Sequence, residues 1–314
     1  VAQDVPLHCV PGLPPGPPVQ FAPNPNDPLR VRKSVFDLSS AELSEHRAAY
    51  AALRALRDRE PDNPLGWQQQ GLVHCWYCSG AADGISGPEI HGGWWFLPWH
   101  RSYLYFHERI LGQLIGKPSF ALPYWDWDSP GRNRIPDAYL SPADASNPLY
   151  DPTRGAGAKH RLPEDFVGTD RMQAILGEKE FGGFGGAGEG ASGQMGAIEG
   201  YPHGGVHVWV PDPVNIDFDH PKPNMGVLAT AAFDPLFYAH HANIDRLWDV
   251  WRTRPGSENP AAPAWHNQPF FFYDQSRQWT GMSVAQVVDG ERTLRCTYQP
   301  PSSVKVVVSS LLRN

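Results

Sequence analysis

The chain of 314 residues has little of several features, and each shortage excludes a class of protein. No apolar run approaches the ~18 residues that a membrane-spanning helix needs, so we expect no membrane span. No cluster of Lys and Arg stands out, and the net charge is −7, which argues against a nucleic-acid partner. Charged residues make up only 19% and hydrophobic residues 41%, as in an ordinary globular protein rather than a disordered one.

Cysteine is also scarce, with four residues in all: Cys9, Cys75, Cys78 and Cys296. Cys75 and Cys78 form a C-x-x-C, a spacing that zinc sites and redox centres use. No second C-x-x-C or H-x-x-x-H follows at zinc-finger spacing, and His74 directly precedes the pair. These surroundings favour another role for the two thiols.

Proline (33) and glycine (31) are abundant, so much of the chain should be loop. Residues 10–28 are proline-rich and predict an extended arm on the surface. Residues 181–196 hold eight glycines but lack the preceding strand and the Lys-Ser/Thr ending of a phosphate cradle, which favours a flexible surface loop. The chain opens without Met or an apolar leader, as expected of a processed mature protein.

Several helices are predicted from residues that commonly begin or end them. Ser39 or Ser40 can cap a helix over about 39–60, with Glu42 in its first turn. Asp234 followed by Pro235 favours another helix start, because aspartate is a good N-cap and proline a good first residue. Further helices are expected over 64–74 and about 97–115. Beyond residue 254 we expect short strands at 269–274, 283–289, 293–299 and 303–312.

Six histidines fall into two groups of three, and each group ends in a helix-like, aromatic-rich stretch. The groups are His74, His91 and His100, then His203, His207 and His241. Residues four apart share one helix face, so His203 and His207 can direct two imidazoles at one ion. The helix that begins at 234–235 offers the third ligand, as His240 or His241. Asp245 lies one turn after His241, placed to hydrogen-bond a ligand imidazole, which favours His241 as ligand and His240 as a packing residue.

Two triads made only of imidazole, with few carboxylates nearby, favour a pair of copper ions. Two coppers that face each other can bind dioxygen between them. His107 is a competing candidate near His100, but it lies two turns away, about 10.5 Å along the helix, and is therefore expected to be structural.

The residues around these histidines resemble the type 3 copper polyphenol oxidase and tyrosinase family, most closely its plant catechol oxidase branch. The pattern H-x-x-x-x-F-x-x-x-H-R-x-x-L-x-x-x-E runs from His91 to Glu108. The pattern D-P-x-F-x-x-x-H-x-x-x-D runs from Asp234 to Asp245. Both occur in the family's order, and the resemblance extends over about residues 30–300.

The resemblance implies that the first group of three histidines binds one copper ion and the second group the other. It also implies that the sulfur of Cys78 bonds covalently to a carbon of His91, holding that imidazole in place. Cys75 would form a disulfide with Cys9 in the N-terminal arm. Glu199 matches a carboxylate that holds a water near the coppers.

Three departures from the family pattern bear on activity. Gly204 stands where an asparagine accompanies efficient attack on monophenols, so its presence favours diphenol oxidation. Leu228 aligns with a bulky phenylalanine over the first copper in many plant members, so a wider entrance is expected. The chain stops at Asn314, without the C-terminal domain that shields the site in latent forms, so it is either the cleaved active form or a naturally short member.

The expected fold is mainly α: a central helix bundle carrying a dinuclear copper site, with loops and a few short β-strands. We expect one catalytic domain over residues 1–314, with 1–30 as a proline-rich arm. The expected activity is oxidation of o-diphenols to o-quinones with reduction of O2 to water, and weak or absent monophenol hydroxylation. Alternatives are a true tyrosinase, an o-aminophenol oxidase or a haemocyanin-like O2 carrier. A dinuclear hydrolase is disfavoured because neither triad includes a carboxylate.

The expected partners are small phenolic substrates and O2. A disulfide would require an oxidising compartment, such as a secreted fraction, a periplasm or an organelle lumen.

Overall fold

The computed structural model describes residues 9, 11–12, 16–78, 89–189 and 193–302. In chain order its elements are β1 (Val19–Gln20), β2 (Arg30–Arg32), η1 (Val35–Asp37), α1 (Ser40–Arg59), α2 (Trp67–Cys78), α3 (Phe96–Leu114), α4 (Asp137–Leu140), α5 (Glu164–Val167), α6 (Thr169–Gly177), α7 (Phe181–Phe184), η3 (Glu199–His203), α8 (Gly204–Trp209), η4 (Ala231–Phe233), α9 (Pro235–Arg252), α10 (Pro263–Asn267), β3 (Pro269–Tyr273), β4 (Trp279–Ser283), α11 (Val284–Val287), α12 (Gly290–Leu294) and β5 (Cys296–Tyr298). The predicted strand at 303–312 lies outside the described residues.

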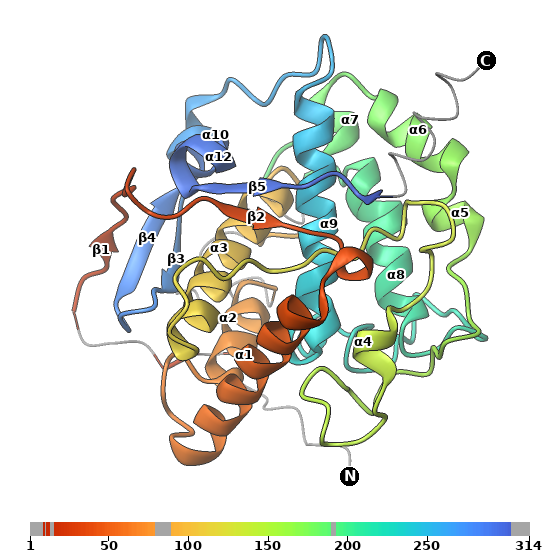
Figure 1. Ribbon diagram of the computed structural model, residues 1–314. Coiled ribbons are helices and arrows are strands. Elements are labelled where there is room, and N and C mark those ends of the chain that lie inside the picture. The colour runs from red at the N-terminus through yellow and green to blue at the C-terminus, as the bar shows by residue number, and fades with distance from the viewer. Residues whose placement is uncertain (1–8, 10, 13–15, 79–88, 190–192, 303–314) are drawn as a thin grey trace.

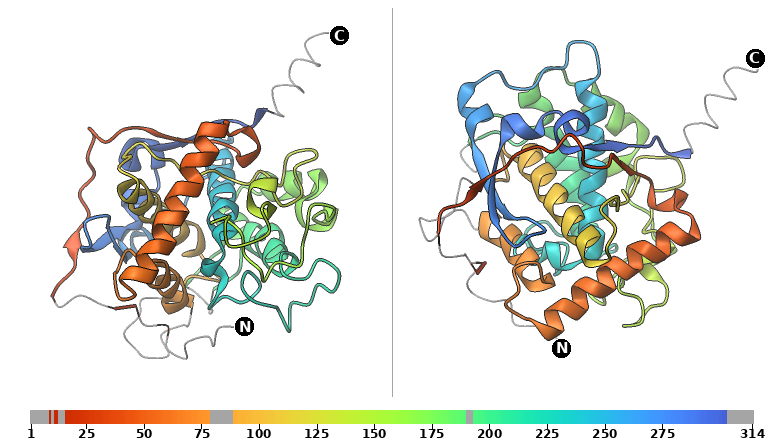
Figure 2. Two further views of the ribbon diagram at one scale, coloured as in Figure 1. Left: turned by 60° about the horizontal axis from the view of Figure 1, so that its bottom comes forward. Right: turned by 60° about the vertical axis from the view of Figure 1, so that its left-hand side comes forward.

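The long helices form a bundle at the centre of the molecule (Figure 1). α3 packs against α9, α1 crosses α3, and α2 packs against both α1 and η4. In the right-hand view of Figure 2, α3 (yellow) and α9 (cyan) lie side by side, with α1 running diagonally beneath them. The mainly helical fold with a central bundle is therefore confirmed. Within the described part of the chain, no helix is both long and apolar enough to cross a membrane.

Two helix starts are fixed by the residues that the sequence indicated. Ser39 caps α1 in a reciprocal capping box with Glu42. Asp234 caps α9 by accepting a hydrogen bond from the backbone N–H of Leu236 at 2.7 Å. Asp234 is fully buried and is also paired with Arg154, whose Nε donates to it at 2.8 Å. This anchored start fixes how far into the core each residue of α9 lies, and hence where the helix places its histidines.

Short parallel strands join the beginning and the end of the described chain. β2 pairs with β5 in parallel, with Arg30 opposite Cys296 and Arg32 opposite Tyr298. A second sheet has the order β1-β4-β3 and lies at the side of the bundle (Figure 1). The strands predicted at 269–274 and 293–299 correspond to β3 and β5, the latter being shorter than expected.

The predicted strand at 283–289 is wrong, because residues Val284–Val287 form the helix α11. Ser283 and Gln286 make a capping box there, and a Ser-x-x-Gln spacing is a helix-start signal. The valines of this stretch suggested a strand because β-branched residues favour strands, but they lie on a single buried helical turn.

The glycine-rich segment is more ordered than a flexible surface loop. Phe181 and Phe184 of α7 are buried, and Phe184 stacks on Trp251 with ring centroids 4.6 Å apart. Gly186 has a φ of +101°, and a Cβ there would lie 2.7 Å from the backbone of Gly93. In its described part, the segment therefore packs closely against the chain that follows His91, and glycine is required for that approach.

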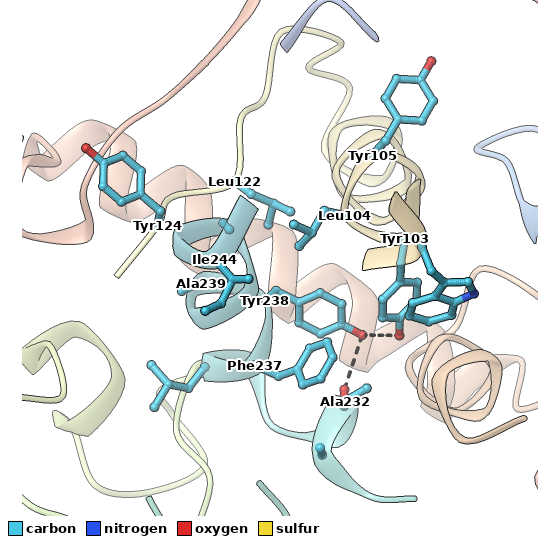
Figure 3. Packing of buried hydrophobic residues seen from close by; sticks show 14 of the residues in the cluster. Tyr103, Leu104, Tyr105, Leu122, Tyr124, Ala232, Phe237, Tyr238, Ala239 and Ile244 are labelled. Atoms are coloured by element: carbon cyan, nitrogen blue, oxygen red, sulfur yellow. Dashed lines mark hydrogen bonds between the residues drawn. The ribbon is translucent and has the colours of Figure 1, made fainter. Parts of the chain in front are cut away.

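Aromatic side chains fill the space between α3 and α9 (Figure 3). The hydroxyls of Tyr103 and Tyr238 are hydrogen-bonded at 2.9 Å, and Tyr238 also donates to the carbonyl of Ala232 at 3.3 Å. The ring of His107 stacks on Tyr238 with centroids 3.6 Å apart, and its Nε2 contacts the hydroxyl of Tyr50 at 3.3 Å. His107 is thus part of the core packing, as predicted.

Candidate metal centre

The first group of histidines converges from three separate segments. His74 lies on α2, His100 on α3, and His91 on the stretch between these helices. The ring centroids are 5.6 Å apart for His74 and His91, 5.7 Å for His74 and His100, and 5.3 Å for His91 and His100. All three side chains are buried. The bundle therefore gathers three imidazoles that lie far apart in the sequence.

The second group converges in the same way. His203 ends η3, His207 lies one turn later on α8, and His241 comes from α9. Ring centroids are separated by 4.5 Å for His203 and His207, 4.9 Å for His203 and His241, and 5.5 Å for His207 and His241. The i, i+4 spacing thus places His203 and His207 together, as the sequence predicted.

The two groups are adjacent. His100 of the first group and His241 of the second stack with ring centroids 4.2 Å apart and planes within 10°. His91 and His203 lie opposite each other at 6.0 Å. The ring of Phe96 packs 4.6 Å from His203 and 4.8 Å from His100, so an apolar wall adjoins both groups. Six imidazoles therefore form one buried cluster.

Backbone carbonyls hold the outer nitrogens of three of these imidazoles. A carbonyl can only accept, so each of these Nδ1 atoms must carry the hydrogen, which leaves the lone pair on Nε2. The contacts are His74 Nδ1 to Leu228 O at 3.1 Å, His100 Nδ1 to Phe96 O at 2.8 Å, and His207 Nδ1 to Met225 O at 2.6 Å. Fixing the tautomer and orientation of an imidazole in this way is typical of metal-binding histidines.

The inner nitrogens fit metal ions. Among the described residues, Nε2 of His91, of His100 and of His203 is buried with no hydrogen-bond partner. Nε2 of His207 and Nε2 of His241 are 3.3 Å apart. Two nitrogens bound to one tetrahedral ion at about 2.0 Å lie about 3.3 Å apart, so this pair already has the spacing of two ligands. Buried polar atoms are rarely left unpaired, and a bound ion would satisfy these.

Five of the six imidazoles are also in the protonation state that ligation requires; burial lowers the pKa of the sixth, His91, but Cys78 and Glu89 raise it well above its usual value. Burial, together with the charge of neighbouring imidazoles, lowers the pKa of His74, of His100, of His203 and of His241 well below the usual value. Burial lowers the pKa of His207 to about 4. Neutral imidazole is the form that binds a metal. Five of the six rings are therefore ready to bind at neutral pH without losing a proton from a charged form.

His240 belongs to the same cluster, since its ligand atoms and those of His203, His207 and His241 lie within 4.8 Å of one another. Its Nδ1, however, accepts a hydrogen bond from Nε1 of Trp127 at 3.0 Å. A neutral imidazole that accepts at Nδ1 carries its hydrogen on Nε2, and that nitrogen has no free lone pair for a metal. This contact favours His241 over His240 as the ligand, which agrees with the sequence-based choice.

Cys78 lies at the edge of the first group. Its Sγ is 3.4 Å from Nε2 of His74, and the ligand atoms of Cys78, His74 and His91 lie within 4.8 Å of one another. The sulfur is thus close to two imidazoles, and a thioether to His91 remains a prediction. The expected disulfide between Cys9 and Cys75 is present and joins the arm to α2.

The prediction for Asp245 is wrong. Its carboxylate receives hydrogen bonds from Nε of Arg101 at 2.5 Å, from Arg32 at 3.3 Å and from the hydroxyl of Tyr298. Nδ1 of His241 is buried without a hydrogen-bond partner in the described part of the chain, so Asp245 does not hold that imidazole. His241 and Asp245 are one turn apart on α9, but Asp245 is drawn into a buried ionic network that joins α3, α9 and the β2–β5 pair. Arginines from distant segments outcompete the nearby ring because charge-assisted hydrogen bonds are the stronger ones.

Glu199 is a buried carboxylate beside the cluster. It is 3% exposed, and its Oε1 accepts a hydrogen bond from the backbone N–H of Gly92 at 2.8 Å. Its Oε2 is buried without a partner in the described structure. Burial raises the pKa of Glu199 to about 7, opposed in part by His91. The residue can therefore exchange a proton near neutral pH, next to the residue that follows His91.

Gly204 and Leu228 lie at the border of the cluster. A Cβ at Gly204 would meet nothing closer than the carbonyl of Glu199 at 3.5 Å and the ring of Phe218 at 3.9 Å, so the position has room for a side chain. The side chain of Leu228 is 43% exposed, while its carbonyl accepts from His74. Leu228 thus combines a backbone role at one histidine with an apolar side chain that faces solvent.

Sequence reasoning missed Glu89. Its carboxylate accepts hydrogen bonds from the backbone N–H of Ile90 at 2.9 Å and of His91 at 3.0 Å, and Oε1 lies 3.4 Å from Nδ1 of His91. A carboxylate next to the outer nitrogen of an imidazole can fix its orientation. The signal available in the sequence was an acidic residue two positions before a candidate ligand.

Comparisons with known proteins agree with this geometry. Residues 64–166 and 141–254 match the family described as the common central domain of tyrosinase, and residues 260–306 match the polyphenol oxidase middle domain. The chain is 38% identical over 310 residues to the chloroplastic latent form of polyphenol oxidase from Prunus armeniaca, which covers 90% of this chain and 50% of that protein. It is 34% identical over 318 residues to chloroplastic catechol oxidase B from Solanum tuberosum, covering 92% and 52%.

Among solved structures, the polyphenol oxidase of Grenache (Vitis vinifera) superposes with a TM-score of 0.82 at 32% identity, covering 96% of this chain and 94% of that one. The chain spans about half the length of the curated relatives above. The family match, the near-complete structural coverage and the six converging imidazoles lead to one assignment. This chain belongs to the tyrosinase and polyphenol oxidase family, whose members carry a type 3 pair of copper ions.

Proposed function

We propose that this chain oxidises o-diphenols to o-quinones and reduces O2 to water, with weak or absent monophenol hydroxylation. The observation that carries the proposal is the buried cluster of six imidazoles, in which the inner nitrogens of His91, His100 and His203 have no hydrogen-bond partner among the described residues. The residues that we assign as copper ligands are His74, His91 and His100 for one ion and His203, His207 and His241 for the other. When bound, the copper pair supplies the binding of O2 and the transfer of electrons.

The protein must also handle protons. Each diphenol that becomes a quinone gives up two electrons and two protons, and reduction of one O2 to two waters consumes four of each. Two diphenols are therefore oxidised per O2. We assign Glu199 as the group that accepts a phenolic proton or holds a water, because its Oε2 is buried and unpaired. A pKa of about 7 suits a group that must take up and release protons near neutral pH.

Gly204 supports diphenol over monophenol oxidation. A diphenol loses its first proton somewhat more readily than a monophenol does, so a monophenol depends more on a well-placed base. An amide side chain at position 204 could hold a water against Glu199, and glycine offers no such group. Position 204 has room for an amide side chain, so glycine at this position changes which groups can hold a water and does not relieve crowding.

We further propose that residues 1–314 form one catalytic domain, with 1–30 as an arm tied to α2 by the disulfide between Cys9 and Cys75. A disulfide persists in an oxidising compartment. Relatives from Prunus armeniaca and Solanum tuberosum are named chloroplastic, which supports an organelle lumen for this chain as well.

Oxygen uptake by copper-loaded protein tests the proposal, with catechol compared with phenol. We expect fast uptake with catechol, and slow uptake or a long lag with phenol. Gly204→Asn should raise the initial rate on phenol about tenfold or more, since general-base assistance contributes about 10²–10⁴-fold where it is present. Equal rates on both substrates in the wild type would make the protein a tyrosinase. No uptake by protein with two coppers per chain would favour an O2 carrier.

A further inference from the structure

Exposed apolar side chains gather on the segments next to the metal centre. Nine large hydrophobic side chains are exposed in the described part of the chain, and five of them belong to residues 195–228. They are Met195 (52% exposed), Tyr201 (47%), Val214 (76%), Phe218 (55%) and Leu228 (43%). A concentration of exposed apolar surface next to a site is more often functional than single exposed residues are.

The same segments make direct contacts with the proposed ligands. Tyr201 lies two residues before His203 on η3. The loop that carries Val214 and Phe218 continues into residues 225–228, whose carbonyls bind the outer nitrogens of His207 and His74. The loop that carries these exposed side chains therefore also contributes backbone groups to the wall of the metal centre.

Phe218 is the best placed of these side chains. Its ring packs edge-on against Phe166, with centroids 6.1 Å apart and planes at 87°. One of its ring carbons lies 3.9 Å from the place where a Cβ of Gly204 would be. Gly204 directly follows the proposed ligand His203. An exposed aromatic ring thus lies next to Gly204, a position without a side chain directly beside this ligand.

A surface hollow lies between α8 and the loop that carries Phe218. It is lined by Val208, which follows the proposed ligand His207, and by polar residues of the loop that include Asn215, Asp217 and His220. An apolar ring beside hydrogen-bonding groups suits a ligand that is aromatic and also carries polar substituents. The loop therefore offers both kinds of contact at a distance from the metals.

We propose that Phe218 is a stacking platform for a second aromatic ring, so that the preferred substrates are two-ring phenols rather than simple catechols. This inference rests on the proposed function, since the catechol ring is taken to lie at the metal centre. The second ring would extend over Gly204 and pack against Phe218. Aromatic rings packed in this way attract each other beyond the effect of buried area alone.

Three substrates test the platform: catechol, 4-phenylcatechol and 4-cyclohexylcatechol. The last two have substituents of similar size, but only the phenyl group has an aromatic face. We expect the wild type to prefer 4-phenylcatechol. In Phe218→Leu, the ratio of kcat/KM for 4-phenylcatechol to that for catechol should fall about three- to tenfold, through KM. Phe218→Tyr should restore it, and Val250→Ala, on the exposed side of α9, should leave it unchanged.

Equal preference for the phenyl and cyclohexyl compounds, or an unchanged ratio in Phe218→Leu, would overturn the platform while leaving the proposed oxidation intact. If copper-loaded protein oxidises none of the three compounds, the proposed function is wrong. A binding measurement then still tests whether Phe218 binds a second aromatic ring. Calorimetry with biphenyl-4-carboxylate and benzoate serves for this. Tighter binding of the biphenyl compound that is lost in Phe218→Leu supports the platform, and equal binding rejects it.

Discussion

Nε2 of His207 and Nε2 of His241 face each other at 3.3 Å between α8 and α9. Because Nδ1 of His207 donates to the carbonyl of Met225, its Nε2 presents a lone pair to the other ring. Without a metal, a hydrogen on His241 can bridge the two nitrogens. An ion bound at Nε2 of His241 requires that hydrogen to move to Nδ1, which is buried without a partner in the described structure, so metal binding at this pair is coupled to a change of tautomer in His241.

The first prediction distinguishes the two adjacent histidines of α9. His241→Gln should reduce the copper content from two ions per chain to one, because the second group loses a ligand. His240→Gln should keep two, since the lone pair of His240 faces Trp127. Elemental analysis of purified protein gives both numbers. His220→Ala, at an exposed histidine, is the control. Loss of copper from His240→Gln alone would reverse the assignment.

The second prediction concerns Glu199 and pH. Burial raises the pKa of this carboxyl from 4.5 to about 7, so the folded state holds the proton more tightly than the unfolded state does. The free energy of unfolding of the wild type, minus that of a Glu199→Gln variant, should therefore fall by about 3 kcal/mol in total as pH rises from about 4.5 to 7.

Urea unfolding of metal-free protein at several pH values measures this difference. Subtracting the curve of Glu199→Gln removes the contribution of the histidines, which both proteins share. A difference that is constant with pH would show that the carboxyl titrates normally.

The third prediction is a covalent bond between Cys78 and His91. It would form by loss of one hydrogen from each partner, with O2, the co-substrate of the proposed reaction, taking the two electrons. After reduction and alkylation, peptides that contain these two residues should stay joined, whereas Cys9 and Cys75 should separate. Mass spectrometry of a digest shows which occurs. An alkylated Cys78 in protein that has turned over substrate would contradict the bond.

The fourth prediction concerns the buried network around Asp245. Asp245→Asn should lower the free energy of unfolding by about 3 kcal/mol, because Arg101 and Arg32 are nearly fully buried and lose a counter-charge. Copper content should stay at two ions per chain, since the carboxylate does not orient an imidazole.

Denaturant unfolding together with metal analysis tests both parts. Lys117→Ala removes a pair with Glu45 in which both side chains are more than a third exposed, and should cost less than about 1 kcal/mol. Lost copper with unchanged stability in Asp245→Asn would support the original ligand-orienting interpretation.

Helix starts, which depend on neighbouring residues, were predicted well from the sequence. The capping box of Ser39 and Glu42 and the start of α9 at Asp234 are set by neighbouring residues, and both are confirmed. The grouping of the histidines followed from helical spacing and from the resemblance to a family. The predicted end of the helix that carries His74 was four residues too early, because nothing in the sequence marks the stop.

The predictions that were wrong concern residues whose partners lie far away in the chain. Asp245 has a suitable neighbour one turn away, but Arg101 and Arg32 reach it from α3 and β2. The glycines near Gly186 predicted a flexible loop, because the sequence does not show that the backbone of Gly93 packs against this segment. No pattern within one segment carries that information.

The disulfide between Cys9 and Cys75 has a consequence for which metal the centre selects. Cys75 and Cys78 are three residues apart on α2, beside His74. If both were thiols, they would form a soft chelating pair, and copper(I) and zinc bind thiolates readily. The disulfide with Cys9 removes Cys75 as a thiol, so that Cys78 is the single thiol near the imidazoles until its predicted bond to His91 forms. Maturation in an oxidising compartment would thus protect the nitrogen site from thiol capture of its metal.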